Sequence, residues 1–192
     1  MTTQKNDVTN LCLAQTDKDY LKQLVKTSIT SYFEGQHALD ENAVPKPKNP
    51  LLAEELGAFV TLTKNGELRG CIGNVVGQGA LYLTIARMAR AAAFEDPRFP
   101  QVSLSEFSEL AIEISIMGPL TLCPDTTLIE IGKHGLIMQC GAHSGLLLPQ
   151  VAKDWCWDRQ TFLEQTCIKA GLQPHMWKHP DTKIYWFEAY VF

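Results

Sequence analysis

The feature that most constrains the fold is a pair of apolar runs joined by Asn65-Gly66. Residues 57–63 (GAFVTLT) precede this dipeptide, and residues 67–73 (ELRGCIG) follow it. Asn-Gly between two apolar runs is typical of a two-residue hairpin turn, because both turn residues adopt positive φ angles. The sequence therefore predicts two antiparallel strands over these residues.

The spacing of apolar residues predicts the other elements. Residues 17–34 and 80–93 have the period of amphipathic helices, and a third helix is expected around Phe162–Ala170. Thr16 or Asp17 is expected to cap the first helix. Alternation predicts a strand over residues 110–116. A second hairpin is expected from 135–140 and 145–148, across residues 141–144, and residues 183–192 are apolar on both faces, which predicts a central strand.

Hairpins combined with helices indicate an α+β fold with mainly antiparallel sheets flanked by helices. The 192 residues are enough for one domain or two small subdomains. Pro45, Pro47 and Pro50 predict a linker or an extended arm between the first helix and the first hairpin. Residues 1–16 are expected to form an N-terminal tail.

The net charge and the spacing of the cysteines limit the kinds of function and the cellular compartments that fit this sequence. The formal net charge is −4, which does not favour a dedicated nucleic-acid binder, although a local basic patch stays open. The six cysteines lie far apart without a CxxC pair, and no apolar signal core or run of about 18 apolar residues is present. We therefore expect a soluble cytoplasmic protein with free thiols, which does not contact a membrane.

The segment Glu67–Asn74 (ELRGCIGN) is the most informative for chemistry. On a regular strand Glu67, Arg69 and Cys71 share one face, and Leu68 and Ile72 point into the core. A guanidinium beside a thiol favours the nucleophilic thiolate, so one reading is a reactive Cys71 with Arg69 as an anion-binding neighbour.

The glycines of this segment allow two readings. Gly70 and Gly73 leave the backbone open to close approach by a ligand or by another strand. The alternative reading of the whole segment is structural, with Cys71 a small core residue and the glycines marking a bulge. The sequence spacing places no histidine base near Cys71.

Other candidate residues have a structural alternative as well. His134, in a turn that leads into a strand, could offer a base at a cleft edge or be a plain turn residue. Asp96 and Arg98 flank Pro97 at a helix end, where they could present charge to a ligand or lock the loop. The four tryptophans, at 155, 157, 177 and 186, are expected to pack in a core rather than stack on bases.

Metal and cofactor sites are not expected. Cys140-x-x-His143 and His175-x-x-x-His179 have ligand-like spacing, but their separation matches no standard zinc site. No phosphate-binding glycine loop is present, which excludes the common nucleotide-binding motifs.

Six segments, in chain order, resemble the AMMECR-like domain family, whose bacterial and archaeal members are called AmmeMemoRadiSam system protein A. They are GAFVTLTKNGELRGCIGN, AAFEDPRFPQV, ELAIEISIMGPL, IGKHGLIM, GLLLPQVAKDWCWD and FLEQTCIKAGL. The resemblance covers residues 17–192. It implies an α+β fold of two intertwined subdomains, and two partners, a Memo-like protein and a radical SAM protein.

The resemblance implies no established activity. Its signature falls on residues 69–73, and its further motifs include Asp96, Arg98 and Gln150. Two hypotheses follow. Either the chain is a thiol-dependent enzyme component with Cys71 and Arg69 as catalytic residues, or it is a non-catalytic adaptor that presents a nucleic acid or protein to those partners. In both cases the expected binding residues are Gly70, Gly73, Asn74, Asp96, Arg98, His134 and Gln150.

Overall fold

The computed structural model describes residues 13–192, whose contacts divide them into two compact units. The N-terminal unit comprises the described residues up to Met117 together with Tyr190–Phe192, and the C-terminal unit comprises Gly118–Ala189. Most of the predicted tail, residues 1–12, lies outside the described part, and the first helix already begins at Gln15.

Helices and antiparallel strands make up both units, so the α+β prediction is confirmed. The N-terminal unit contains, in chain order, α1 (Gln15–Phe33), the 3₁₀ helix η2 (Pro50–Ala53), β1 (Ala58–Lys64), β2 (Glu67–Asn74), α2 (Leu81–Phe94), α3 (Leu104–Phe107) and β3 (Ala111–Met117). The C-terminal unit contains β4 (Thr121–Leu122), η3 (Thr126–Leu128), β5 (His134–Cys140), β6 (His143–Leu147), α4 (Pro149–Asp154), α5 (Arg159–Lys169), η4 (Pro174–Lys178) and β7 (Lys183–Val191).

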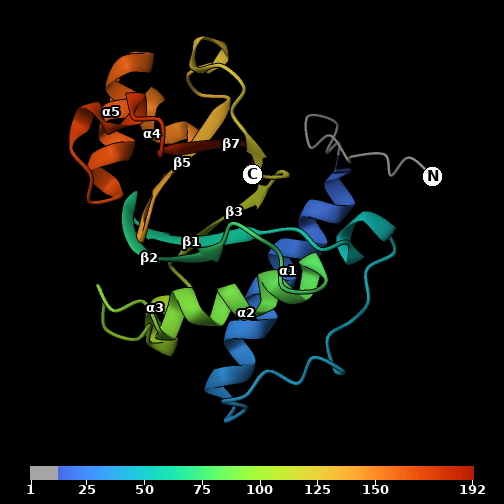
Figure 1. Ribbon diagram of the computed structural model, residues 1–192. Coiled ribbons are helices and arrows are strands. Elements are labelled where there is room, and N and C mark those ends of the chain that lie inside the picture. The colour runs from blue at the N-terminus through green and yellow to red at the C-terminus, as the bar shows by residue number, and fades with distance from the viewer. Residues whose placement is uncertain (1–12) are drawn as a thin grey trace. The chain divides into compact units, whose positions relative to one another are not determined.

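In the N-terminal unit, β1 pairs antiparallel with β2 on one side and with β3 on the other. Asn65 and Gly66 have φ angles of 51° and 83°, which confirms the predicted hairpin turn. Figure 1 shows α1 and α2 together on one side of β1 and β2. β2 is therefore an edge strand whose outer backbone groups need partners from outside the sheet.

A β-bulge changes the faces of β2. Leu62 lies opposite Gly70 and Thr63 lies opposite Leu68, so Arg69 is the extra residue of the bulge. The prediction that Leu68 points into the core is wrong, since Leu68 is 42% exposed. The predicted shared face of Glu67, Arg69 and Cys71 is also wrong, because the bulge interrupts the alternation between them.

The strands of the C-terminal unit pair with one another around β7. β7 pairs with β4 and with β5, so it is internal in the sheet, as its two apolar faces predict. β5 and β6 form the second predicted hairpin, in which Cys140 lies opposite His143. Within residues 13–192 no three histidine, cysteine or acidic side chains are grouped as metal ligands would be.

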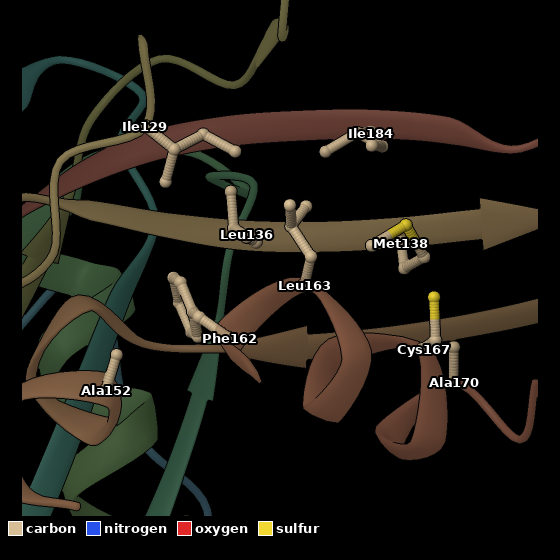
Figure 2. Packing of buried hydrophobic residues seen from close by; sticks show 9 residues of the cluster. All are labelled: Ile129, Leu136, Met138, Ala152, Phe162, Leu163, Cys167, Ala170 and Ile184. Carbon is tan, nitrogen blue, oxygen red and sulfur yellow. The ribbon is translucent and has the colours of Figure 1, made fainter. Parts of the chain in front are cut away.

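The core of the C-terminal unit lies between its sheet and α5. Figure 2 shows Leu163 and Cys167 of α5 pointing toward Leu136 and Met138 of β5. Three tryptophans, at 157, 177 and 186, pack against this core, as predicted. The prediction is wrong for Trp155, which is 69% exposed.

Smaller differences from the sequence predictions concern helix ends and short helices. Ala14 is the N-cap of α1 and makes no side-chain cap hydrogen bond, so the prediction of a cap at Thr16 or Asp17 is wrong. Gly35 and Gly171 follow α1 and α5 with φ angles of 90° and 74°, a left-handed conformation in which glycine commonly ends a helix. No helix in residues 13–192 combines the length and the apolar character that a bilayer span requires.

Candidate functional site

Cys71 lies on the edge strand β2, and both of its outward backbone groups are bound by one loop. Its N–H donates to Asp96 Oδ2 at 2.9 Å, and its carbonyl oxygen accepts from Arg98 Nη2 at 3.2 Å. A neighbouring strand would supply the same donor and acceptor. We call these two side chains the edge clamp, because they replace a strand at this position.

The edge clamp is itself held together by hydrogen bonds. Arg98 donates to Asp96 Oδ1 from its backbone N–H and from Nε, at 3.1 and 2.9 Å, and to Oδ2 from Nη2 at 2.7 Å. The Asp96 side chain is 2% exposed, whereas that of Arg98 is 53% exposed. The hydrogen bonds from Arg98 hold the pKa of Asp96 well below its usual range, and Asp96 in turn raises the pKa of Arg98. The clamp therefore stays an ion pair at any ordinary pH.

Cys71 is a partly exposed residue, and its sulfur contacts a side chain of β1. The hydroxyl group of Thr61 donates to Cys71 Sγ at 3.3 Å from the opposite position on β1. The structure thus gives Cys71 one fixed backbone position and one polar neighbour for its sulfur.

The two signature glycines are required by packing within the chain. A Cβ atom on Gly70 would lie 2.1 Å from the carbonyl oxygen of Ala92 in α2, and one on Gly73 would lie 2.2 Å from the ring of Phe59. The close approach is therefore made by a helix and an aromatic side chain. Asn74 ends β2 opposite Ala58.

The Arg69 side chain forms an ion pair with the carboxylate of Glu106. Its Nε and Nη2 donate to Glu106 in α3 at 2.8 and 3.1 Å, a bidentate pair that lowers the pKa of Glu106. The third nitrogen, Nη1, is buried and has no hydrogen-bond partner within residues 13–192. The ring of Phe99 lies 5.9 Å from the Arg69 guanidinium carbon and 5.4 Å from that of Arg98. Arg69 thus joins β2 to α3 beside the edge clamp.

His134 and Gln150 belong to the C-terminal unit. His134 is buried, and its Nδ1 accepts the backbone N–H of Glu130 at 3.0 Å, so the neutral ring carries its proton on Nε2. Nε2 lies 3.9 Å from Glu188 Oε1, and the ring lies 4.4 Å from that of Trp186. Burial, followed by the charge of Lys133, lowers the pKa of His134. Gln150 lies in α4, and its Oε1 is buried without a partner within residues 13–192.

The structure therefore brings Arg69, Gly70, Cys71, Asp96 and Arg98 together in the N-terminal unit. Sequence reasoning missed Thr61 and Glu106, whereas Phe99 falls in the family motif that contains Asp96 and Arg98. A regular two-residue hairpin places Val60 opposite Cys71, and only the bulge moves Thr61 there. Glu106 is far away in sequence and has no motif that marks it.

Comparisons with known proteins agree with this architecture. The AMMECR1 family model matches residues 22–192. A protein of Thermococcus onnurineus is 40% identical over 184 residues, which cover 91% of this chain and 88% of that protein. A protein of Methanopyrus kandleri is 43% identical over 183 residues, which cover 91% and 86%. The crystal structure of an uncharacterized protein of Pyrococcus horikoshii superposes with a TM-score of 0.81 at 38% identity, covering 90% of this chain and 88% of that one.

Proposed function

Because the chain belongs to the AMMECR1 family, we propose that it is a thiol-dependent enzyme component in which Cys71 is the reacting group. It acts in the cytoplasm together with a Memo-like protein and a radical SAM protein. In the reaction, the thiolate sulfur bonds to an electrophilic carbon of the substrate. The leaving group departs with its bonding electrons, and the thiol proton passes to water.

One observation carries this proposal: the backbone of Cys71 is bound on its outer side by the edge clamp while its side chain stays partly exposed. A group that reacts repeatedly must be held in one geometry, since positioning supplies much of the rate. The edge clamp binds both the N–H and the carbonyl oxygen of Cys71, so the backbone of the reacting residue keeps one position relative to a bound substrate.

The neighbouring groups supply the electrostatics that a thiol reaction needs. Thr61 donates a hydrogen bond to the sulfur, and the half-exposed Arg98 guanidinium presents N–H groups to an anionic part of the substrate. Arg69 has a positioning role in this account, because Glu106 already takes two of its three nitrogens.

A second candidate function is a non-catalytic adaptor. It is favoured by the absence of a base, since no hydrogen bond or ion pair joins a histidine of residues 13–192 to Cys71. It is also favoured by the pairing of both nearby guanidinium groups with carboxylates. In that case a partner protein binds at the edge clamp, and the Cys71 thiol takes no part in a reaction.

Co-expression with the two partner proteins tests the proposal. Intact mass and peptide mapping of the recovered chain would report a covalent adduct on Cys71 in the wild type. Cys71→Ser should carry none, and Cys156→Ser is the matched control because Cys156 is an exposed cysteine of the other unit.

The two candidates give opposite results. An adduct on Cys71 that survives in Cys156→Ser supports the enzyme component. A chain without any adduct, whose Cys71→Ser variant still binds both partners as tightly as the wild type, contradicts it and supports the adaptor.

A further inference from the structure

Arg90 of α2 is a second arginine whose surroundings need an explanation. The residue is 6% exposed, so its guanidinium is taken almost entirely out of bulk water. Nε donates to the carbonyl oxygen of Ser28 at 2.9 Å, Nη1 to that of His37 at 3.2 Å, and Nη2 to the hydroxyl of Ser31 at 2.7 Å. All three acceptors are neutral.

No carboxylate of residues 13–192 lies within ion-pair distance of Arg90. The other arginines described in the same unit are all paired, namely Arg69 with Glu106, Arg87 with Glu41 and Arg98 with Asp96. A buried cation without a counter-charge is costly, and the C-terminal end of α1 offsets only part of that cost through its helix dipole. Burial accordingly lowers the pKa of Arg90.

A small pocket opens beside this guanidinium. Its volume is about 90 Å³, which is enough to hold water or a small anion. Arg90 forms part of the wall, and three hydroxyl side chains line it as well, those of Thr27, Ser28 and Ser31. The guanidinium has five N–H groups and the contacts above use one on each nitrogen, so Nη1 and Nη2 each keep a second donor.

We propose that this pocket binds a small oxyanion, a carboxylate or a phosphate group, with Arg90 as its counter-charge. A planar guanidinium fits two oxygens of such a group. The Ser31 hydroxyl already donates to the Ser28 carbonyl oxygen, whereas that of Thr27 only accepts, from Gln23 Nε2, and keeps its proton as a further donor. Asp40 also lines the pocket, with its Oδ1 bound to the backbone N–H of Asn42. A carboxylate at the wall favours an anion that also carries a hydrogen-bond donor, as hydrogen phosphate does and acetate does not. The site is separate from Cys71 and does not depend on the function proposed for it.

Calorimetric titration of the full chain with sodium phosphate and with sodium acetate tests the pocket, against sodium chloride at equal ionic strength. We expect saturable binding of at least one oxyanion, accompanied by a rise in Tm that chloride does not reproduce. Saturation by phosphate alone identifies a phosphate site, and saturation by acetate alone identifies a carboxylate site.

Variants at Thr27 keep the test independent of folding, because Thr27 lies on the exposed face of α1 at the pocket wall. Thr27→Glu adds a negative charge and should weaken binding about tenfold, which corresponds to about 1.4 kcal/mol. Thr27→Gln is the uncharged control and should bind nearly as the wild type does. Arg90→Met should abolish binding, and Arg87→Met on the same helix should not.

Two results would overturn the proposal. One is equal behaviour of the wild type in phosphate, acetate and chloride. The other is equal binding by Thr27→Glu and Thr27→Gln, which would place the anion elsewhere on the molecule.

Discussion

The Asp96 carboxylate accepts the backbone N–H of Cys71 in the place where a neighbouring strand would otherwise accept it. Replacing a single oxygen atom of this carboxylate would disturb the contact. The carboxylate accepts N–H groups at both oxygens, from Cys71 and from Arg98, and it is almost fully buried. An amide in its place would turn one acceptor into a donor facing another donor.

Asp96→Asn should therefore destabilise the protein by about 1–3 kcal/mol at pH 7, measured by urea unfolding. The folded pKa of Asp96 lies below its unfolded value of about 3.9, so its contribution is complete above that pH and is lost as the pH falls below it. The variant should lose less stability than the wild type on acidification. Asp181→Asn, at a carboxylate that is 82% exposed, is the control and should change neither quantity.

At Gly70, packing against α2 leaves no room for a side chain. Gly70→Ala would place a methyl group against the backbone carbonyl of Ala92, which cannot move without displacing α2. We expect a loss of more than about 2 kcal/mol, at the upper end of ordinary substitutions. Leu68→Ala on the same strand serves as the control, because Leu68 is 42% exposed and should cost little. A Gly70→Ala protein with a wild-type Tm would contradict the close packing described above.

At the scale of the element, the sequence predicted the hairpin, and its structural reading a bulge at the glycines, but not the register that the bulge at Arg69, beside Gly70, produces. Asn65-Gly66 determines the turn, and the apolar runs determine the two strands. The bulge at Arg69 depends instead on the pairing of Arg69 with Glu106 and on the fit of Gly70 against α2, which are long-range contacts. For that reason the position of Cys71 was predicted on the correct strand but with the wrong neighbours.

The Arg69–Glu106 ion pair joins α3 to β2 and should make a measurable contribution to the free energy of unfolding. Both side chains are mostly buried, at 12% and 18% exposed, so Arg69→Met and Glu106→Gln should each destabilise the fold by about 1–3 kcal/mol. The double variant should lose clearly less than the sum, since the partners no longer leave each other unpaired. A matching cycle between Lys64 and Glu106, 3.9 Å apart and more exposed, should give a coupling near zero. Equal coupling in the two cycles would contradict a specific role for Arg69.

His134 should make the stability of the C-terminal unit depend on pH. Its folded pKa is lowered by burial, so the unfolded chain binds the proton more readily, and stability rises with pH up to about 6.5. His134→Asn keeps an acceptor for the Glu130 N–H and should flatten this rise in a series of thermal melts. His179→Asn, at a side chain that is 47% exposed, should leave the profile unchanged. A wild-type profile in His134→Asn would show that another group is responsible.

At the scale of the whole molecule, local patterns predicted the α+β class and most elements, whereas tertiary contacts decided the site. The prolines at 45, 47 and 50 correctly excluded regular structure before η2. The short helices α3 and α4 have too few residues for a periodic signal. Trp155 was misjudged because large aromatic residues usually enter a core, and no local pattern distinguishes it from Trp157.

Both proposed sites belong to the N-terminal unit and both involve α2. Ala92 presses its carbonyl against Gly70 beside Cys71, and Arg90 lines the oxyanion pocket two residues earlier. The helix therefore has one face that supports the edge strand and another that lines a pocket against α1.

The central claim, that Cys71 is the reacting group, is tested most directly by the alkylation rate of each of the six thiols. Iodoacetamide labelling near neutral pH, read residue by residue by mass spectrometry, supplies those rates. We expect Cys71 to react fastest, ahead of the more exposed Cys156, and Cys123 and Cys167, whose pKa values are raised by burial, to react slowly. A Cys71 that is protected, or no faster than Cys156, would contradict it and leave the segment around Cys71 as a structural hairpin edge.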